Sequence, residues 1–199
     1  MLMWNWLVIV VVIIIIIIIV IVITSLSSST TTTTTEPVQT DSNVRIYMYD
    51  KANPDVKLYL SADSALTLVS KSSNATKFQI ASTDAVSMTQ ITGSWDAHFY
   101  IKNGTSKLTF AAGDGTCNIS MSSATSDGSV LFFRTTDMVD PVPTGTILKF
   151  NSPIGISPAL TTVACYGQAL AVNVTSGVFY SVNGAAAPSA NMTWYFEPA

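Results

Sequence analysis

The pattern of apolar and polar positions divides the chain into three parts. Residues 1–23 are almost wholly apolar, and Leu7 to Ile23 is an unbroken run of 17 Leu, Val and Ile residues. Residues 24–43 are rich in Ser and Thr, whereas residues 44–199 alternate between apolar and polar positions over short stretches. A long uncharged apolar run is typical of a membrane-spanning helix, and alternation with period two is typical of half-buried strands. The sequence therefore predicts an anchor, a tether and one all-β domain.

The apolar N-terminal segment is predicted to be a transmembrane helix. Its 23 residues span roughly 35 Å as a helix, and the hydrocarbon core of a bilayer is about 30 Å thick. In lipid, a helix satisfies its own backbone, which outweighs the preference of Ile and Val for strands. Trp4 and Trp6 lie where an interfacial aromatic anchor is expected. The alternative is a cleaved signal peptide, which needs a basic start and a shorter apolar run.

The segment after the anchor is predicted to be a linker. Every residue from Thr24 to Thr35 is Ser or Thr except Leu26, and such a composition cannot build a core. Residues 24–43, taken as a flexible chain, have a mean reach of roughly 25 Å. The alternative is an O-glycosylated stalk, which would be stiffer and longer. Both interpretations hold the β domain away from the membrane.

Four types of strand-like segment recur three times in the same order along the domain. The repeats are expected at about 44–82, 97–136 and 146–199, and the third repeat is lengthened by an insertion from Asn151 to Gly167. The first type begins at Arg45, His98 and Ile147, and the second at Lys57, Lys107 and Ala169. The third type begins at Ala65, Cys117 and Gly177, and the fourth at Thr76, Ser129 and Met192. A recurring order of this kind indicates an internally repeated architecture.

Three repeats of four short strands resemble the β-trefoil, whose twelve strands form a six-stranded barrel capped by three hairpins. The resemblance covers residues 44–199, and the run from Tyr59 to Ala62 (YLSA) is similar to the opening of a fascin-type repeat. Ricin-type lectins of this fold carry Gln-x-Trp in the closing strands, and the closing strands TKFQIA, SVLFFRT and MTWYFE all lack it. The sugar site of those lectins is therefore not implied. A β-sandwich of similar strand number is the alternative architecture.

Composition and motifs favour a binding function over a catalytic one. Charged residues make up 11% of the chain, the net charge is −3, and no Lys or Arg precedes Arg45, so the sequence lacks the basic stripe that nucleic acid requires. His98 is the single histidine, and the sequence has no nucleophile elbow, no clustered metal ligands and no phosphate loop. We therefore expect no catalytic residue, cofactor or metal, and no nucleic-acid partner.

Cysteines and glycosylation sequons bear on the compartment. Cys117 and Cys165 permit one disulfide, but the sequence alone does not decide between a disulfide and two half-buried thiols. Five Asn-x-Ser/Thr sequons slightly exceed chance, and Asn118 is a poor acceptor because it lies inside a predicted strand. The other four sequons suggest a lumenal or extracellular domain, and they begin at Asn74, Asn103, Asn173 and Asn191.

Strand alternation also predicts a surface of tyrosines. When the apolar residues of each strand point inward, Tyr47, Tyr49, Tyr59 and Tyr100 point to the opposite face. Tyrosine is favoured at contact surfaces because its ring is apolar and its hydroxyl polar. These four residues are therefore our candidate contact surface. The alternative is that hairpins and long loops cover them.

Two functions from different classes fit this sequence. The first is a structural module that links a lipid bilayer to a protein lattice, since anchor, tether and compact β domain together resemble membrane-anchored minor capsid proteins of large icosahedral DNA viruses. The second is a stalked cell-surface or envelope lectin that binds glycans. We favour the first, with the domain between an internal virion membrane and the capsid. It predicts bare sequons, whereas a lectin would be glycosylated and its cysteines oxidised.

Overall fold

The computed structural model describes residues 36–63, 65–83, 97–113, 117–135, 147–183 and 192–199. The predicted anchor at residues 1–23, with Trp4, Trp6, Leu7 and Ile23, lies outside the described residues, as does the tether up to residue 35. In the part of the chain that is described, no helix is both long enough and apolar enough to cross a membrane. The described residues are all-β, as the sequence predicts.

Twelve strands and two short 3₁₀ helices make up the described secondary structure. They are β1 (Asn43–Tyr49), β2 (Lys57–Ser61), β3 (Thr67–Val69), η1 (Ser72–Asn74), β4 (Phe78–Ser82), β5 (Phe99–Asn103), β6 (Ser106–Ala112), β7 (Cys117–Ser122), η2 (Asp127–Ser129), β8 (Leu131–Thr135), β9 (Ile154–Pro158), β10 (Gln168–Asn173), β11 (Val178–Asn183) and β12 (Tyr195–Pro198).

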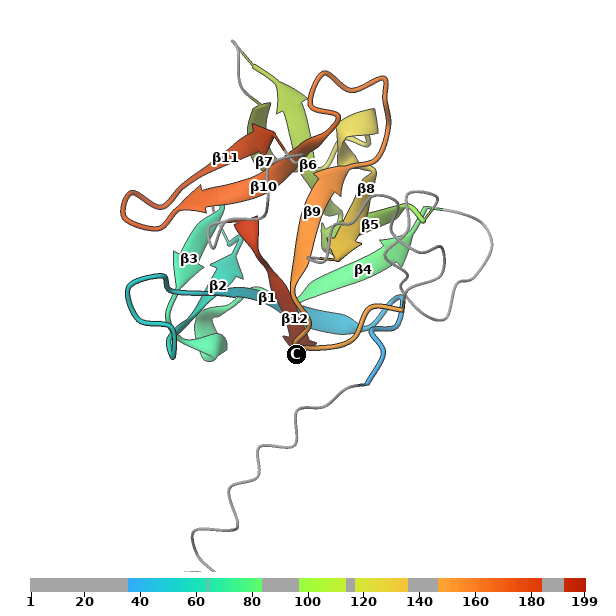
Figure 1. The fold of residues 1–199 in the computed structure, drawn as a ribbon. Coiled ribbons are helices and arrows are strands. Elements are labelled where there is room, and N and C mark those ends of the chain that lie inside the picture. Colours follow the sequence, from blue (N-terminus) through green and yellow to red (C-terminus); the bar gives the residue numbers. More distant parts are fainter. Residues whose placement is uncertain (1–35, 64, 84–96, 114–116, 136–146, 184–191) are drawn as a thin grey trace, which may run out of the picture. The chain divides into compact units, whose positions relative to one another are not determined.

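Antiparallel pairing joins these strands into a curled ten-stranded sheet and a separate hairpin, β10–β11. Strand β1 pairs with β12 and β4, β4 with β5, β5 with β8, and β8 with β9. An isolated bridge joins Ile154 of β9 to Trp194, the residue immediately before β12. Strand β12 in turn pairs with β1. Followed from neighbour to neighbour, these pairings return to their starting strand. Hairpins β2–β3 and β6–β7 branch from this series at β1 and β5, whereas β10–β11 pairs with none of its strands in the described part of the chain (Figure 1).

The core lies on the inner face of the curled sheet. Ile46 and Met48 of β1 are both fully buried, and they alternate with residues on the opposite face. Trp194 is also fully buried, and its indole Nε1–H donates a hydrogen bond to the carbonyl oxygen of Leu170 at 3.0 Å. Phe99 stacks on Phe133 with ring centroids 5.4 Å apart. The large inward side chains thus come from all three predicted repeats.

The β domain begins earlier than the sequence predicts. Val38, expected within the tether, is fully buried in the core. The backbone N–H of Val38 donates a hydrogen bond to the carbonyl oxygen of Leu148 at 2.9 Å. The backbone N–H of Phe150 donates one to the carbonyl oxygen of Glu36 at 3.0 Å. The boundary at residue 44 is wrong because one apolar side chain and these backbone hydrogen bonds attach the preceding residues to the domain.

The opening strand of the third repeat also differs from the prediction. It was expected at residues 147–150, but these residues form only isolated bridges beside residues 36–38. The strand in that position is β9, Ile154–Pro158, inside the segment taken as an insertion. The sequence did not indicate this strand because it contains Pro158, and proline has no backbone N–H to donate to the hydrogen bonds of a central strand. Proline is tolerated here because it lies at the end of β9.

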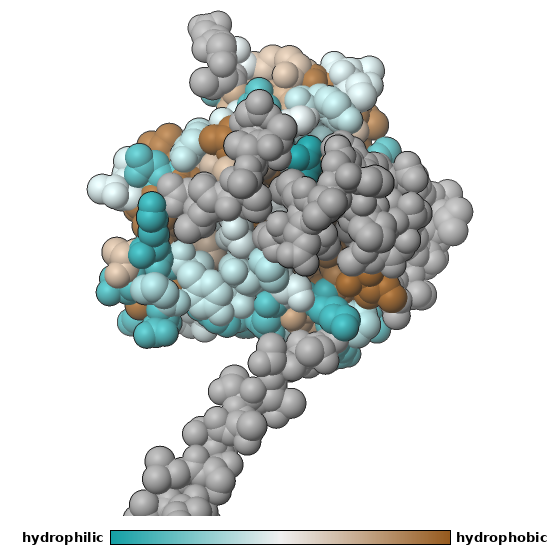
Figure 2. All heavy atoms as spheres, in the orientation of Figure 1, coloured by the Kyte–Doolittle hydropathy of each residue, from teal (hydrophilic) through white to brown (hydrophobic). Residues whose placement is uncertain are grey.

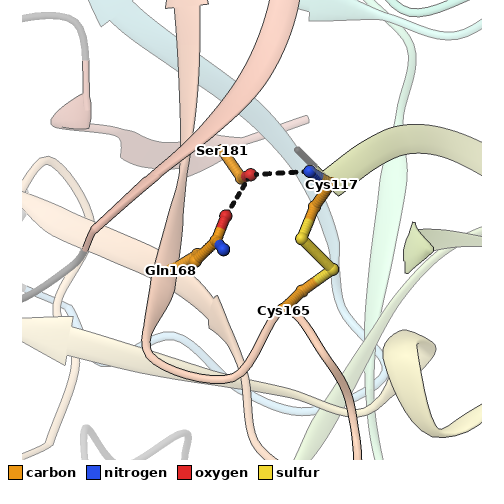
Figure 3. The surroundings of a disulfide bond; sticks show 4 residues. All are labelled: Cys117, Cys165, Gln168 and Ser181. Carbon is orange, nitrogen blue, oxygen red and sulfur yellow. Dashed lines mark hydrogen bonds between the residues drawn. A yellow bond between two sulfur atoms is a disulfide. The ribbon is translucent and has the colours of Figure 1, made fainter. Parts of the chain in front are cut away.

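The two cysteines form a disulfide, which answers the question that the sequence left open. Cys117 begins β7, and Cys165 lies in the connection between β9 and β10, with their Cα atoms 5.9 Å apart. Both are buried. Ser181 of β11 accepts a hydrogen bond from the Cys117 N–H at 3.2 Å and donates one to the side chain of Gln168 (Figure 3). The disulfide therefore connects the β6–β7 hairpin to the segment that leads into the β10–β11 hairpin.

Candidate functional site

The register of three neighbouring strands places four tyrosines together. Tyr47 of β1 lies opposite Tyr59 of β2 on one side and opposite Tyr195 of β12 on the other. Tyr49 lies two residues along β1, on the same face as Tyr47. All four rings lie on the side of the sheet opposite Ile46, which points into the core. We call these four residues the tyrosine cluster.

The rings of the tyrosine cluster contact one another directly. Tyr47 stacks on Tyr195 with ring centroids 5.2 Å apart, and it meets Tyr49 edge to face at 5.6 Å. Tyr59 lies 5.7 Å from Tyr47 at a tilt, and Tyr49 meets Tyr195 edge to face at 5.0 Å. Aromatic pairs in these arrangements stabilise by about 0.5–1.5 kcal/mol beyond the area they bury. The cluster is thus a packed group of rings.

Charged side chains border the cluster on both neighbouring strands. The Lys57 Nζ lies 4.1 Å from the centroid of the Tyr47 ring and 2.7 Å from Oε2 of Glu197. Arg45 lies opposite Glu197 in the β1–β12 pairing, with its Nη1 4.0 Å from Oε1. The Tyr59 hydroxyl donates to Glu197 Oε2 at 3.4 Å. One carboxylate from β12 thereby connects cations on β1 and β2.

Burial divides the cluster into a covered centre and an open edge. Tyr47 is 0% exposed and Tyr59 only 7%, whereas Tyr49 is 37% exposed; Tyr195 is half-buried. Tyr47 and Tyr59 therefore lie on the predicted face of their strands but are covered there, which is the alternative that the sequence left open. Alternation determines the face on which a side chain lies, but large neighbours on that face determine its exposure.

The surroundings of three tyrosines of the cluster raise their pKa values. Burial raises the pKa of Tyr47, and the neighbouring Tyr49 and Glu197 raise it further. Burial first, and then the charge of Glu197, raises the pKa of Tyr59 to about 12. The pKa of Tyr195 is raised mainly by burial. These three phenols therefore remain protonated in alkaline solution in which an ordinary tyrosine begins to ionise. A neutral ring with a hydroxyl group suits contact with a partner.

Tyr100 does not belong to the tyrosine cluster. It lies half-buried on β5, with the Lys107 Nζ 4.7 Å from its ring centroid, and no described ring contact joins it to the other tyrosines. Conversely, the sequence did not point to Tyr195, Lys57 or Glu197. They follow the same alternation, but their role depends on β1 lying between β2 and β12, which no local pattern shows.

An open groove of about 570 Å³ adjoins the cluster at Lys57 and Tyr59. Polar and apolar residues line it together: Asp55, Val56, Lys57 and Tyr59, with three serines and Lys71 at residues 70–73. In Figure 2 the surface around the β2–β3 hairpin is mostly hydrophilic. Hydroxyl, carboxylate and ammonium groups beside an aromatic ring offer hydrogen bonds and a stacking face to a polar ligand.

The described sequons lie at the surface. Asn74 in η1 and Asn173 at the end of β10 are exposed, and Asn103 at the end of β5 is half-buried. Asn118 is exposed within β7, inside a strand as predicted. Asn191 lies outside the described residues.

Among the described residues, no group of three or more His, Cys, Asp or Glu is arranged to hold a metal ion. A scan against models of known protein families found no match, and a search of curated proteins found none either. The fold and the tyrosine cluster thus define an all-β domain with an aromatic surface formed by β1, β2 and β12.

Proposed function

We propose that the protein is a single-pass membrane-anchored interaction module that binds a protein partner through the open edge of the tyrosine cluster. The observation that carries this proposal is that Tyr49, 37% exposed, packs at 5.0 Å against Tyr195 above the buried ring of Tyr47. Aromatic residues at the centre of an interface, with a polar rim, commonly supply most of the binding energy.

Preorganisation favours this surface as a contact site. Tyr49 and Tyr195 rest on Tyr47, whose hydroxyl donates to Asn151 Oδ1 at 3.0 Å. Because the rings already pack together, a partner would order few side chains on binding, which reduces the entropic cost of association. The exposed Val56 lies next to Lys57, the residue opposite Tyr49 in the β1–β2 pairing, and adds an apolar contact.

The β domain is proposed to be a β-trefoil. Its twelve strands fall into three sets of four, β1–β4, β5–β8 and β9–β12. In each set the first and last strands belong to the series of pairings that returns to β1, and the middle two form a hairpin. A β-sandwich would instead divide the strands between two face-to-face sheets.

The anchor at residues 1–23 and the Ser/Thr tether supply the membrane attachment in this proposal. The partner is proposed to be a protein lattice that lies on the extracytosolic side of the membrane. The buried Cys117–Cys165 disulfide favours the oxidising, extracytosolic side of the membrane for the domain. On this point the proposal departs from the position between an internal virion membrane and the capsid, with bare sequons, that the sequence favoured.

Site-directed photo-crosslinking in the assembled particle or membrane tests the proposal. A photoreactive phenylalanine analogue replaces Tyr49 in one full-length variant and Tyr166, 39% exposed and outside the cluster, in the matched control. We expect one partner protein to be crosslinked from position 49 and not from position 166. We also expect Tyr49→Ser to reduce the association of that partner protein with the membrane at least tenfold. Equal crosslinking from both positions, or unchanged association in Tyr49→Ser, contradicts the proposal.

Glycan binding is the second candidate function, and the groove beside Tyr59 is the observation that favours it. Asp55, Lys71 and the neighbouring serines present the hydroxyl and charged groups that bind sugar hydroxyls. A glycan-array measurement distinguishes the two candidates. Binding that is lost in Asp55→Ala and retained in Tyr49→Ser would support the lectin.

A further inference from the structure

The loop joining β10 and β11 holds a glycosylation sequon in a defined turn. Asn173 ends β10 and pairs with Val178, the first residue of β11. The Asn173 Oδ1 accepts hydrogen bonds from the backbone N–H of Thr175 at 3.1 Å and of Ser176 at 3.2 Å. Gly177, with φ of 68°, closes the loop, and its N–H donates to the carbonyl oxygen of Asn173 at 2.7 Å.

We propose that Asn173 carries an N-linked glycan. The side-chain oxygen of Asn173 is held by the loop, and the structure gives its Nδ2 no hydrogen bond within the described part of the chain. Asn173 and Thr175, the two residues that define the sequon, are both exposed. The amide nitrogen is therefore available for substitution without breaking a contact of the fold.

The turn depends on short-range contacts alone. The hydrogen bonds that shape it join residues two to four positions apart in the sequence. Asx turns of this kind form locally, without a finished tertiary structure. The acceptor conformation is thus accessible to an emerging chain, which matters because a transferase meets the chain before the β domain is complete.

The folded domain also has space for a glycan at this position. The β10–β11 loop projects from the edge of the domain, at the left in Figure 1. Val178, beside the acceptor, is 58% exposed, the most exposed of the large apolar side chains in the described residues. A glycan on Asn173 would stand beside this apolar residue and shield it from other molecules.

The disulfide supplies an independent argument for the compartment. Structural disulfides form in oxidising compartments such as the lumen of the endoplasmic reticulum, where N-linked glycans are also added. Cys117 and Cys165 are 6% and 0% exposed, so their bond belongs to the interior of the folded domain. The inference therefore rests on the extracytosolic placement in the proposed function, and it adds a modification to that placement.

The chemistry is a glycosyl transfer from a polyisoprenyl-diphosphate-linked oligosaccharide. The Asn173 Nδ2 forms a bond to the anomeric carbon of the first sugar, while the bond from that carbon to the diphosphate oxygen breaks. The polyisoprenyl diphosphate leaves as the anion, and the proton lost from Nδ2 passes to a base of the host transferase. No oxidation or reduction takes place.

Peptide mapping of the full-length protein expressed in eukaryotic cells tests the inference. We expect the peptide containing Asn173 to carry a glycan, and to appear without it, with Asp at position 173, only after treatment with an N-glycosidase. Asn173→Gln and Thr175→Ala should each remove one glycan from the intact mass, and Thr175→Ser should retain it. Asn118→Gln, at an exposed strand position, is the matched control and should leave the Asn173 peptide modified.

Two outcomes would overturn the inference, and they differ in what else they overturn. A bare Asn173 in protein whose Cys117–Cys165 disulfide has formed would refute the glycan alone and leave the interaction module standing. A bare Asn173 in protein whose two cysteines are free thiols would also refute the extracytosolic placement. Circular dichroism of each variant establishes that the fold is retained.

Discussion

Replacing both Cys117 and Cys165 by Ala is expected to lower the free energy of unfolding of the β domain by about 5 kcal/mol. The two cysteines are 48 residues apart, and a cross-link that closes a loop of this length restricts the unfolded chain by about 4 kcal/mol. Loss of two buried sulfur atoms adds a packing term on the order of 1 kcal/mol. Since small domains unfold with about 5–15 kcal/mol, the disulfide supplies a large part of the stability.

Urea denaturation of residues 34–199, which form one compact unit, measures this effect. Tryptophan fluorescence reports unfolding because Trp194 is fully buried. With an m value of roughly 2 kcal/mol per molar urea, the midpoint should fall by roughly 2.5 M. Reduction of the unaltered domain by dithiothreitol is the control, since it opens the same loop and keeps the sulfur atoms. A double variant whose midpoint stays within roughly 0.3 M of the oxidised domain would refute the reasoning.

Further predictions concern single residues. Glu197→Gln should destabilise the domain by about 1 kcal/mol in the same assay, because the carboxylate is mostly but not fully buried; an unchanged urea midpoint would show that its ion pairs contribute nothing. Stability should fall as pH rises from about 10 to about 12, because the unfolded chain loses the Tyr59 proton near pH 10 while the fold retains it up to about 12. Denaturation midpoints across this range should fall less steeply in Tyr59→Phe, and an equal slope would contradict the raised pKa. Gly128→Ala should cost more than about 2 kcal/mol, because a Cβ there would lie 1.9 Å from the backbone oxygen of Phe110. Gly104→Ala is its control: open space surrounds that position and only its φ of 58° opposes a side chain, so its cost should be nearer 1 kcal/mol.

Local patterns in the sequence determined the strand content and the inward faces. Alternation along β1 placed Ile46 and Met48 in the core and Tyr47 on the opposite face, and the structure agrees on all three. The β5–β6 hairpin turns at Asn103-Gly104, a pair typical of such turns, and Gly104 has the positive φ that the turn requires. These features were predictable because backbone geometry within a few residues decides them. The anchor at residues 1–23 stays a prediction from the sequence alone.

Only the tertiary structure decided which strands are neighbours and how deeply each side chain is covered. Tyr47 is buried because β2 and β12, which are far apart in the sequence, place Tyr59 and Tyr195 on either side of it. The pairing of Cys117 with Cys165 likewise depends on β7 approaching the connection between β9 and β10. Contacts between distant segments leave no periodic trace in the sequence, because they arise from the packing of whole strands.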